Sequence, residues 1–106
     1  MPTYLWQASY NAEGAKGLVK DGGTTRRNMV KAMVEKAGGK LVAFYFAFGE
    51  SDVYGIAEFP DNASAVATSL AVNASGAVSL KSTVLITPEE VDAAAKKSVG
   101  YRPPGA

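Results

Sequence analysis

The chemistry open to this chain is limited by the side chains that it lacks. Its 106 residues include neither cysteine nor histidine, which excludes thiol nucleophiles, disulfides, histidine bases and the usual zinc and haem ligands. A Mg²⁺ or Ca²⁺ site would need closely spaced acidic ligands, and Glu50, Asp52, Asp61 and Asp92 do not show such spacing. The sequence therefore predicts no metal and no cofactor, and any reaction would use carboxylates, lysines, tyrosines or hydroxyls.

Asp52 is the candidate catalytic residue. It follows the turn at residues 49–51, at the start of an expected strand and among aromatic residues. A carboxylate that is held away from water in this way can act as a general base. Aspartate also serves turns by accepting hydrogen bonds from nearby backbone N–H groups, which is the commoner role. Both interpretations of Asp52 stay open at this point.

The candidate ligand-binding residues are Trp6, Arg26, Tyr45 and Tyr54. These three aromatic side chains, together with Tyr4, could line a pocket and donate hydrogen bonds to a small aromatic or polyketide-like molecule. Their alternative place is the core or a subunit interface. Arg26 and its neighbour Arg27 open an expected helix, where a positive charge opposes the helix dipole. One of them would then meet an anionic ligand or a carboxylate of another subunit, or both are simply solvated.

Charge and composition exclude two classes of partner. Eleven basic and ten acidic side chains give a net charge of +1, without the basic stripe that nucleic-acid binding requires. Residues 62–80 carry no charge, but their many Ser, Thr and Asn side chains are too polar for a bilayer. We expect neither a nucleic-acid nor a membrane partner. Residues 1–4 lack the features of a signal peptide, so we expect a cytoplasmic protein.

Hydrophobic periodicity and capping residues define the elements that must position these side chains. They predict strands over 3–9, 41–48, 52–59 and 77–86, a short helix over 11–19, and longer helices from Thr24 or Thr25 to Gly38, from Pro60 to Gly76 and from Thr87 onward. We expect a single domain over 1–98 and an extended or disordered tail over 99–106, because Gly and Pro are frequent in the tail.

The order βαββαβ with an added C-terminal helix predicts an α+β, ferredoxin-like sandwich, with both main helices on one face of the sheet. Alternation places Trp6 opposite Leu5 in the first strand and Leu41 opposite Phe44 in the second. Both sides of these strands are apolar. A sheet with one wet face would alternate more cleanly, so we expect a second subunit to cover the open face.

The helix expected over 60–76 has an apolar stripe that includes Val66 and Leu70, and this stripe should face the core. Its opposite side, with Ser64, Thr68 and Ser69, is small and neutral instead of charged. A neutral surface lets another protein approach without desolvating ions. We therefore expect this side to contact another subunit; the alternative is an ordinary neutral helix in an alanine-rich protein.

Four segments carry a resemblance to a known family: residues 10–18 (YNAEGAKGL), 49–53 (GESDV), 58–62 (EFPDN) and 75–78 (SGAV) followed by Thr83. They resemble the GYD family of small bacterial proteins, and most of the chain takes part. Ser51 stands where the family's signature has Tyr, so a role of that phenol would be lost here or moved to Tyr54. The resemblance implies a ferredoxin-like domain that dimerises sheet to sheet into an α/β barrel, and it implies no established biochemical function.

Two functions of different classes fit these observations. The first is binding of a small molecule in a pocket of a homo-oligomeric α/β barrel, with cofactor-independent enzymology as one version of it. A pocket where Asp52, a tyrosine and an arginine converge would favour this hypothesis. The alternative is a structural or assembly module without a catalytic site, whose pockets are filled by side chains. A ligand-sensing regulator is a third hypothesis, which needs a partner that the sequence does not show.

Overall fold

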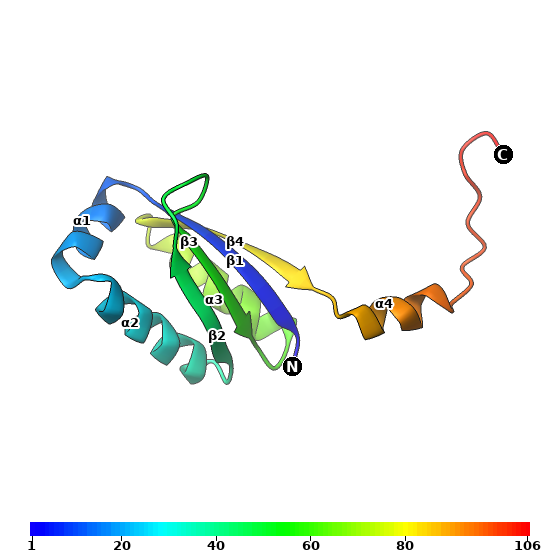
Figure 1. Ribbon diagram of the computed structural model, residues 1–106, viewed down its shortest axis with the longest axis horizontal. Helices are drawn as coiled ribbons and strands as arrows, with labels where there is room; N and C mark the ends of the chain where they lie inside the picture. The colour runs from blue at the N-terminus through cyan, green and yellow to red at the C-terminus, as the bar shows by residue number, and fades with distance from the viewer.

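The computed structural model describes residues 1–106 and contains four strands and four helices (Figure 1). In chain order they are β1 (Thr3–Tyr10), α1 (Ala12–Asp21), α2 (Gly23–Lys36), β2 (Lys40–Phe46), β3 (Val53–Glu58), α3 (Asn62–Ala74), β4 (Val78–Leu85) and α4 (Pro88–Ala95). Every strand and helix expected from the sequence is present, with small shifts at the ends.

The four strands form one antiparallel sheet in the order β2-β3-β1-β4, so that β1 and β3 are central. Helices α2 and α3 cover the same face of this sheet, because Val30 and Val34 of α2 and Ala65 of α3 belong to one buried cluster. The other face carries no helix. The predicted α+β, ferredoxin-like architecture is confirmed.

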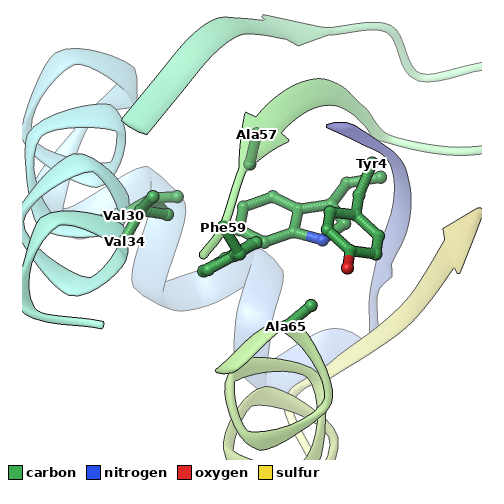
Figure 2. Close-up of a cluster of buried hydrophobic side chains, with 7 residues drawn as sticks. Tyr4, Val30, Val34, Ala57, Phe59 and Ala65 are labelled. Atoms are coloured by element: carbon green, nitrogen blue, oxygen red, sulfur yellow. The ribbon is translucent and has the colours of Figure 1, made fainter. Parts of the chain in front are cut away.

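Aromatic rings fill the layer between the sheet and the helices. Tyr4 and Trp6 of β1 each place their ring centroid 5.8 Å from that of Phe59, which follows β3. Val34 of α2 and Ala65 of α3 belong to the same buried cluster (Figure 2). Edge-on and tilted ring pairs add to the energy of area burial, so β1 is held firmly at the centre of the core.

The two faces of β1 alternate as predicted. Tyr4, Trp6 and Ala8 are buried under the helices, whereas Leu5 and Gln7 are half-buried on the open face. The site residues on β1 therefore lie on the helix side, where the core and any internal cavity must form.

The predicted alternation of β2 is wrong at Leu41. A β-bulge occurs at Val42. Leu41 pairs with Ala57 and Ala43 pairs with the adjacent Ile56, so Val42 is one extra residue on β2. One extra residue reverses the side on which the preceding residues lie. Leu41 and Phe44 consequently both pack against the core from the helix side.

The expected cap of α2 by Thr24 or Thr25 is also wrong. The helix begins at Gly23 behind an N-cap at Gly22, without any side-chain cap. Gly22 also ends α1, because its N–H donates to the Leu18 carbonyl at 2.8 Å. Its φ of +83° suits only glycine without strain. A single glycine thus joins two helices, and the threonines fall inside the second one.

Helix α3 packs on the sheet through the side opposite to the predicted one. Thr68 is 5% exposed on the inner side, whereas Val66 and Leu70 are 54% and 65% exposed on the outer side. The rings of Tyr4 and Trp6 already occupy the space above β1, so only small side chains of α3 fit against them.

Polar side chains of α3 form hydrogen bonds with the sheet. The Ser69 and Ser82 hydroxyl oxygens are 2.8 Å apart, which joins α3 to β4. The Asn73 side chain donates to the Leu80 carbonyl and accepts from the Leu80 N–H, at 3.1 and 2.7 Å. The neutral polar side of the helix therefore faces its own sheet and is not the subunit contact that we predicted for it.

Beyond β4 the chain leaves the body of the molecule (Figure 1). Helix α4 and residues 96–106 extend outward, and every residue from 86 to 106 is exposed. The molecule measures 57 × 32 × 22 Å as a result. None of its helices combines the length and the apolar composition that crossing a membrane requires.

Candidate functional site

A cavity of about 480 Å³ lies on the helix side of the sheet, between α1, the first half of α2, the end of α3 and the start of β4. Met33 and Val72 belong to its largely apolar wall. A recess of about 30 Å³ reaches Trp6 on β1 and shares Tyr10 and Arg26 with the larger space. We call the two spaces together the helix-side cavity. Their volume lies in the range of roughly 300–1,000 Å³ that is typical of small-molecule sites.

The cavity exists because only one end of α1 is tied to the sheet. Asn11 caps α1 by accepting from the Gly14 N–H at 3.0 Å, and it also bonds to the backbone of Gly76 and Ala77. A Cβ on Gly14 would collide with the Ala77 carbonyl, so glycine permits this close approach. Gly17, one turn later, faces open space, with no atom within 4 Å of an added Cβ.

Arg26 is the only cation in the wall of the helix-side cavity. Its Nε is buried without a hydrogen-bond partner, and its guanidinium group takes no part in the chain's one ion pair, between Lys31 and Glu35. Glu13 and Asp21 line the wide part of the cavity but not the recess. Because a guanidinium group does not lose its proton in proteins, the inner end of the cavity is electropositive.

Trp6 supplies a second donor without a partner. The residue is 3% exposed, and its Nε1 has no acceptor within the chain. Packing against Phe59 holds the indole ring in place. A buried N–H group without an acceptor costs about 1–3 kcal/mol, and native structures contain few such groups. An acceptor from outside the chain, a ligand or a water molecule, would remove this cost.

Asp52 lies apart from the cavity and makes structural hydrogen bonds. Its Oδ2 accepts from the Tyr10 N–H at 2.8 Å. Its own N–H donates to the Ala8 carbonyl, and its carbonyl accepts from the Ala47 N–H, each at 2.8 Å. Asp52 therefore joins the end of β1 to the β2–β3 hairpin, and it is not part of the cavity wall.

Tyr45 and Tyr54 lie on the other face of the sheet. They are paired across β2 and β3, on the side opposite the buried Val53 and Gly55. Tyr45 is 71% exposed. Neither tyrosine lines the helix-side cavity, so both belong to the uncovered face.

Of the predicted site residues, only Trp6 and Arg26 lie at the helix-side cavity, while Tyr45 and Tyr54 are neighbours on the other face. Sequence reasoning missed Tyr10, Glu13 and Asp21 as parts of the same site. The alternation of β1 already puts Tyr10 on the side of Trp6, which is a signal that was available. The position of α1, which brings Glu13 and Asp21 to the cavity, depends on the Gly14 contact and leaves no such signal.

A family model described as GYD domain matches residues 4–95. The chain belongs to the GYD domain family. No curated protein and no solved structure matched the chain.

The matched GYD segment runs from β1 to the end of α4 and so includes every element of the cavity wall. The resemblance seen in the sequence is confirmed. Ser51, which the resemblance puts at the position of the signature Tyr, is half-buried in the loop between β2 and β3. Residues 96–106 lie beyond the GYD match.

Proposed function

We propose that this GYD-family chain binds a small, mostly apolar molecule with one anionic group in the helix-side cavity. The observation that carries the proposal is the coincidence of two buried donors without partners, Arg26 Nε and Trp6 Nε1, on side chains that line one recess. The rest of the recess is apolar except for Tyr10. A ligand with an acceptor at its inner end would pair with these donors and leave its apolar part against Val72 and Met33.

The charges around the cavity favour a monoanion, such as a carboxylate. A hydrogen bond between a guanidinium group and a carboxylate is roughly twice as strong as a neutral one. Glu13 and Asp21 face the wide part of the cavity, where they would repel a second negative group. A dianion or a phosphate ester would therefore bind less well than a monocarboxylate of similar size.

We propose binding and assign no catalytic residue. A general base would have to reach a molecule in the cavity, and Asp52 is outside the wall and already accepts from the Tyr10 N–H. The other titratable groups at the wall are Glu13 and Asp21, in addition to the Tyr10 phenol. Acid–base catalysis in the cavity would have to use one of these three groups.

We further propose that the chain works as a homodimer through the open face of the sheet. Leu5, Tyr54 and Ile56 are partly exposed on this face, Tyr45 is largely exposed, and no helix of the same chain covers them. Apolar and aromatic side chains of this kind are enriched in interfaces. If the chain were an assembly module only, this face would be its working surface and the cavity would bind nothing.

A variant that blocks the cavity distinguishes a ligand-binding protein from an assembly module. Gly17 lines the cavity, and Gly49 lies in the β2–β3 loop; an added Cβ meets no atom within 4 Å at either position. Gly17→Phe should fill the cavity, whereas Gly49→Phe is a matched control outside it. We expect benzoate or octanoate at ten times Kd to raise the melting temperature by roughly 5–10 °C in the wild type and in Gly49→Phe.

The same ligands should not raise the melting temperature of Gly17→Phe. The corresponding amides should raise the melting temperature only slightly in all three proteins. Circular dichroism would establish that Gly17→Phe is folded. Equal shifts for Gly17→Phe and the wild type would place binding elsewhere, and the absence of a shift with any monocarboxylate would favour the assembly module.

A further inference from the structure

The C-terminal arm, which we define as residues 86–106, packs on nothing in its own chain. Helix α4 has eight residues and none of them is buried. Four large apolar side chains of the arm are between 55% and 84% exposed: Ile86, Val91, Val99 and Tyr101. Isolated helices of this length are marginal in water, so α4 requires another surface to be stable.

The arm leaves the body in a direction that its first residues restrict. Thr87 precedes Pro88, which confines it to extended backbone, and its φ and ψ are −73° and 156°. A capping box joins it to Glu90: the Thr87 hydroxyl accepts from the Glu90 N–H at 3.1 Å, and the Thr87 N–H donates to Glu90 Oε1 at 3.2 Å. Only Ile86 is left as a hinge, and α4 points away from α3 of the same chain (Figure 1).

The size of the molecule shows how much surface is left uncovered. The chain exposes 7233 Å², whereas a compact monomer of 11.0 kDa exposes about 5,600 Å². Its Cα radius of gyration is 17.1 Å, against about 13 Å for a compact domain of this length. A standard interface takes about 800 Å² from each partner. The excess of about 1,600 Å² is thus sufficient for an arm contact in addition to a sheet contact.

Helix α3 offers a surface of matching character. Its outer side carries the exposed Val66 and Leu70 together with exposed alanines at 63, 67 and 74. No residue from 62 to 80 is charged, so a helix can pack along α3 without desolvating an ion. On α4, Val91, Ala94 and Ala95 follow the spacing i, i+3, i+4 and share one face. Alanines on both helices permit a short distance between the helix axes.

We propose that α4 of one copy packs along the outer side of α3 of a second copy of this chain. The restricted direction of the arm keeps α4 from its own α3, and the two apolar stripes complement each other. This contact is separate from the open face of the sheet, because α3 covers the opposite face. The two contacts together would hold more than two chains, or would bind one pair of chains twice.

Cysteine cross-linking tests this contact directly, because the chain has no cysteine of its own. A chain with Leu70→Cys is co-expressed with a chain with Val91→Cys and treated with a short bismaleimide. We expect a product of twice the chain mass, formed roughly a hundredfold faster than from the Val19→Cys and Val91→Cys pair, because neighbouring groups have millimolar effective concentrations. Val19 on α1 serves as the control: at 86% exposed it is even more accessible than Leu70 at 65%, so a slower reaction of its pair cannot come from burial.

The other possible positions of the arm give different products. If the arm folds back on its own α3, a chain carrying both Leu70→Cys and Val91→Cys forms only an internal link at high dilution, and the intermolecular product is missing. If the arm instead lies on the open face of the sheet, Val91→Cys links to Ile56→Cys and not to Leu70→Cys. Either result, or equal rates for the Leu70 and Val19 pairs, overturns the proposal.

Discussion

Asp52 and Arg26 are both charged, and their surroundings give them different roles. The Asp52 carboxylate holds the end of β1 through the Tyr10 N–H, so its hydrogen bond is made within the fold. Arg26 has a buried Nε without any partner, so its hydrogen bond remains to be made. Asp52 therefore makes a structural hydrogen bond, and the unpaired Nε of Arg26 supports the proposal that Arg26 binds a ligand.

Replacement of Asp52 should reduce stability and leave binding intact. Asp52→Ala removes the acceptor of the half-buried Tyr10 N–H, and loss of such a partner costs about 1–3 kcal/mol. Urea unfolding would measure the loss, with Glu50→Ala as the control, because exposed Glu50 makes no side-chain hydrogen bond. A stable Asp52→Ala variant that had lost ligand binding would contradict this role.

Asp61 makes the cap of α3 sensitive to pH. Its carboxylate accepts a hydrogen bond from the Ser64 N–H at 2.8 Å, and the bonds to Ser64 lower the pKa of Asp61 below its ordinary value of 3.8. A lowered pKa in the folded state stabilises the fold above the unfolded pKa, and this stability is lost as the pH falls through the folded pKa.

Melting curves at several pH values would therefore distinguish the wild type from Asp61→Asn. Asparagine also caps helices but does not titrate. The wild type should melt at a higher temperature than Asp61→Asn above about pH 4, and the difference should disappear at lower pH. A difference that persisted at pH 2 would show that the charge of Asp61 is not its cause.

At the scale of elements, the orientation of α3 shows what a hydrophobic pattern conveys and what it does not. The stripe with Val66 and Leu70 predicts the wrong inner face, because volume decides which side fits against Tyr4 and Trp6. The bulge at Val42 is hidden for a related reason: its neighbours Leu41 and Ala43 are also apolar, so alternation cannot reveal an extra residue. Element types and topology follow from pattern and caps, whereas packed faces depend on the opposing side chains.

Two alanines of α3 test its orientation. Ala65 is 4% exposed in the core cluster, and Ala67 is exposed on the outer side. Ala65→Leu should destabilise the fold by about 1–3 kcal/mol through overpacking. Ala67→Leu should change the free energy of unfolding by no more than about 0.5 kcal/mol. Denaturant titration of both variants would measure the contrast, and the reverse order would mean that the predicted orientation was right.

At the scale of the whole molecule, the helix-side cavity and the open face lie on opposite sides of one sheet. The sequence pattern indicates both Trp6, as an aromatic residue on a strand, and Arg26, as a cation at the N-terminal end of a helix, where its charge opposes the helix dipole. Their meeting in one recess could not be predicted, because it depends on where α2, which begins behind Gly22, lies relative to β1. Strands that are apolar on both sides predict a second subunit, and the open face of the sheet is where we propose that it binds.

A charge on the open face should weaken the proposed homodimer. Ile56→Glu would bury a carboxylate between two sheets, and interface changes at buried apolar positions raise Kd at least about tenfold. Sedimentation velocity at micromolar concentration would measure the shift to smaller species. Val19→Glu makes the same change of charge on exposed α1 and should sediment like the wild type. Unchanged sedimentation of Ile56→Glu would remove the sheet contact from the proposal.

The most direct test of ligand binding uses the fluorescence of Trp6, the only tryptophan of the chain. Titration with an apolar monocarboxylate should change this fluorescence to saturation in the wild type. Arg26→Gln should raise Kd roughly ten- to a hundredfold, since a hydrogen bond to a charged group contributes about 1.5–3 kcal/mol. Arg27→Gln, whose side chain bonds only to Asn28, should bind like the wild type. Equal affinities of Arg26→Gln and Arg27→Gln, or no saturable change in the wild type, would contradict binding in the helix-side cavity.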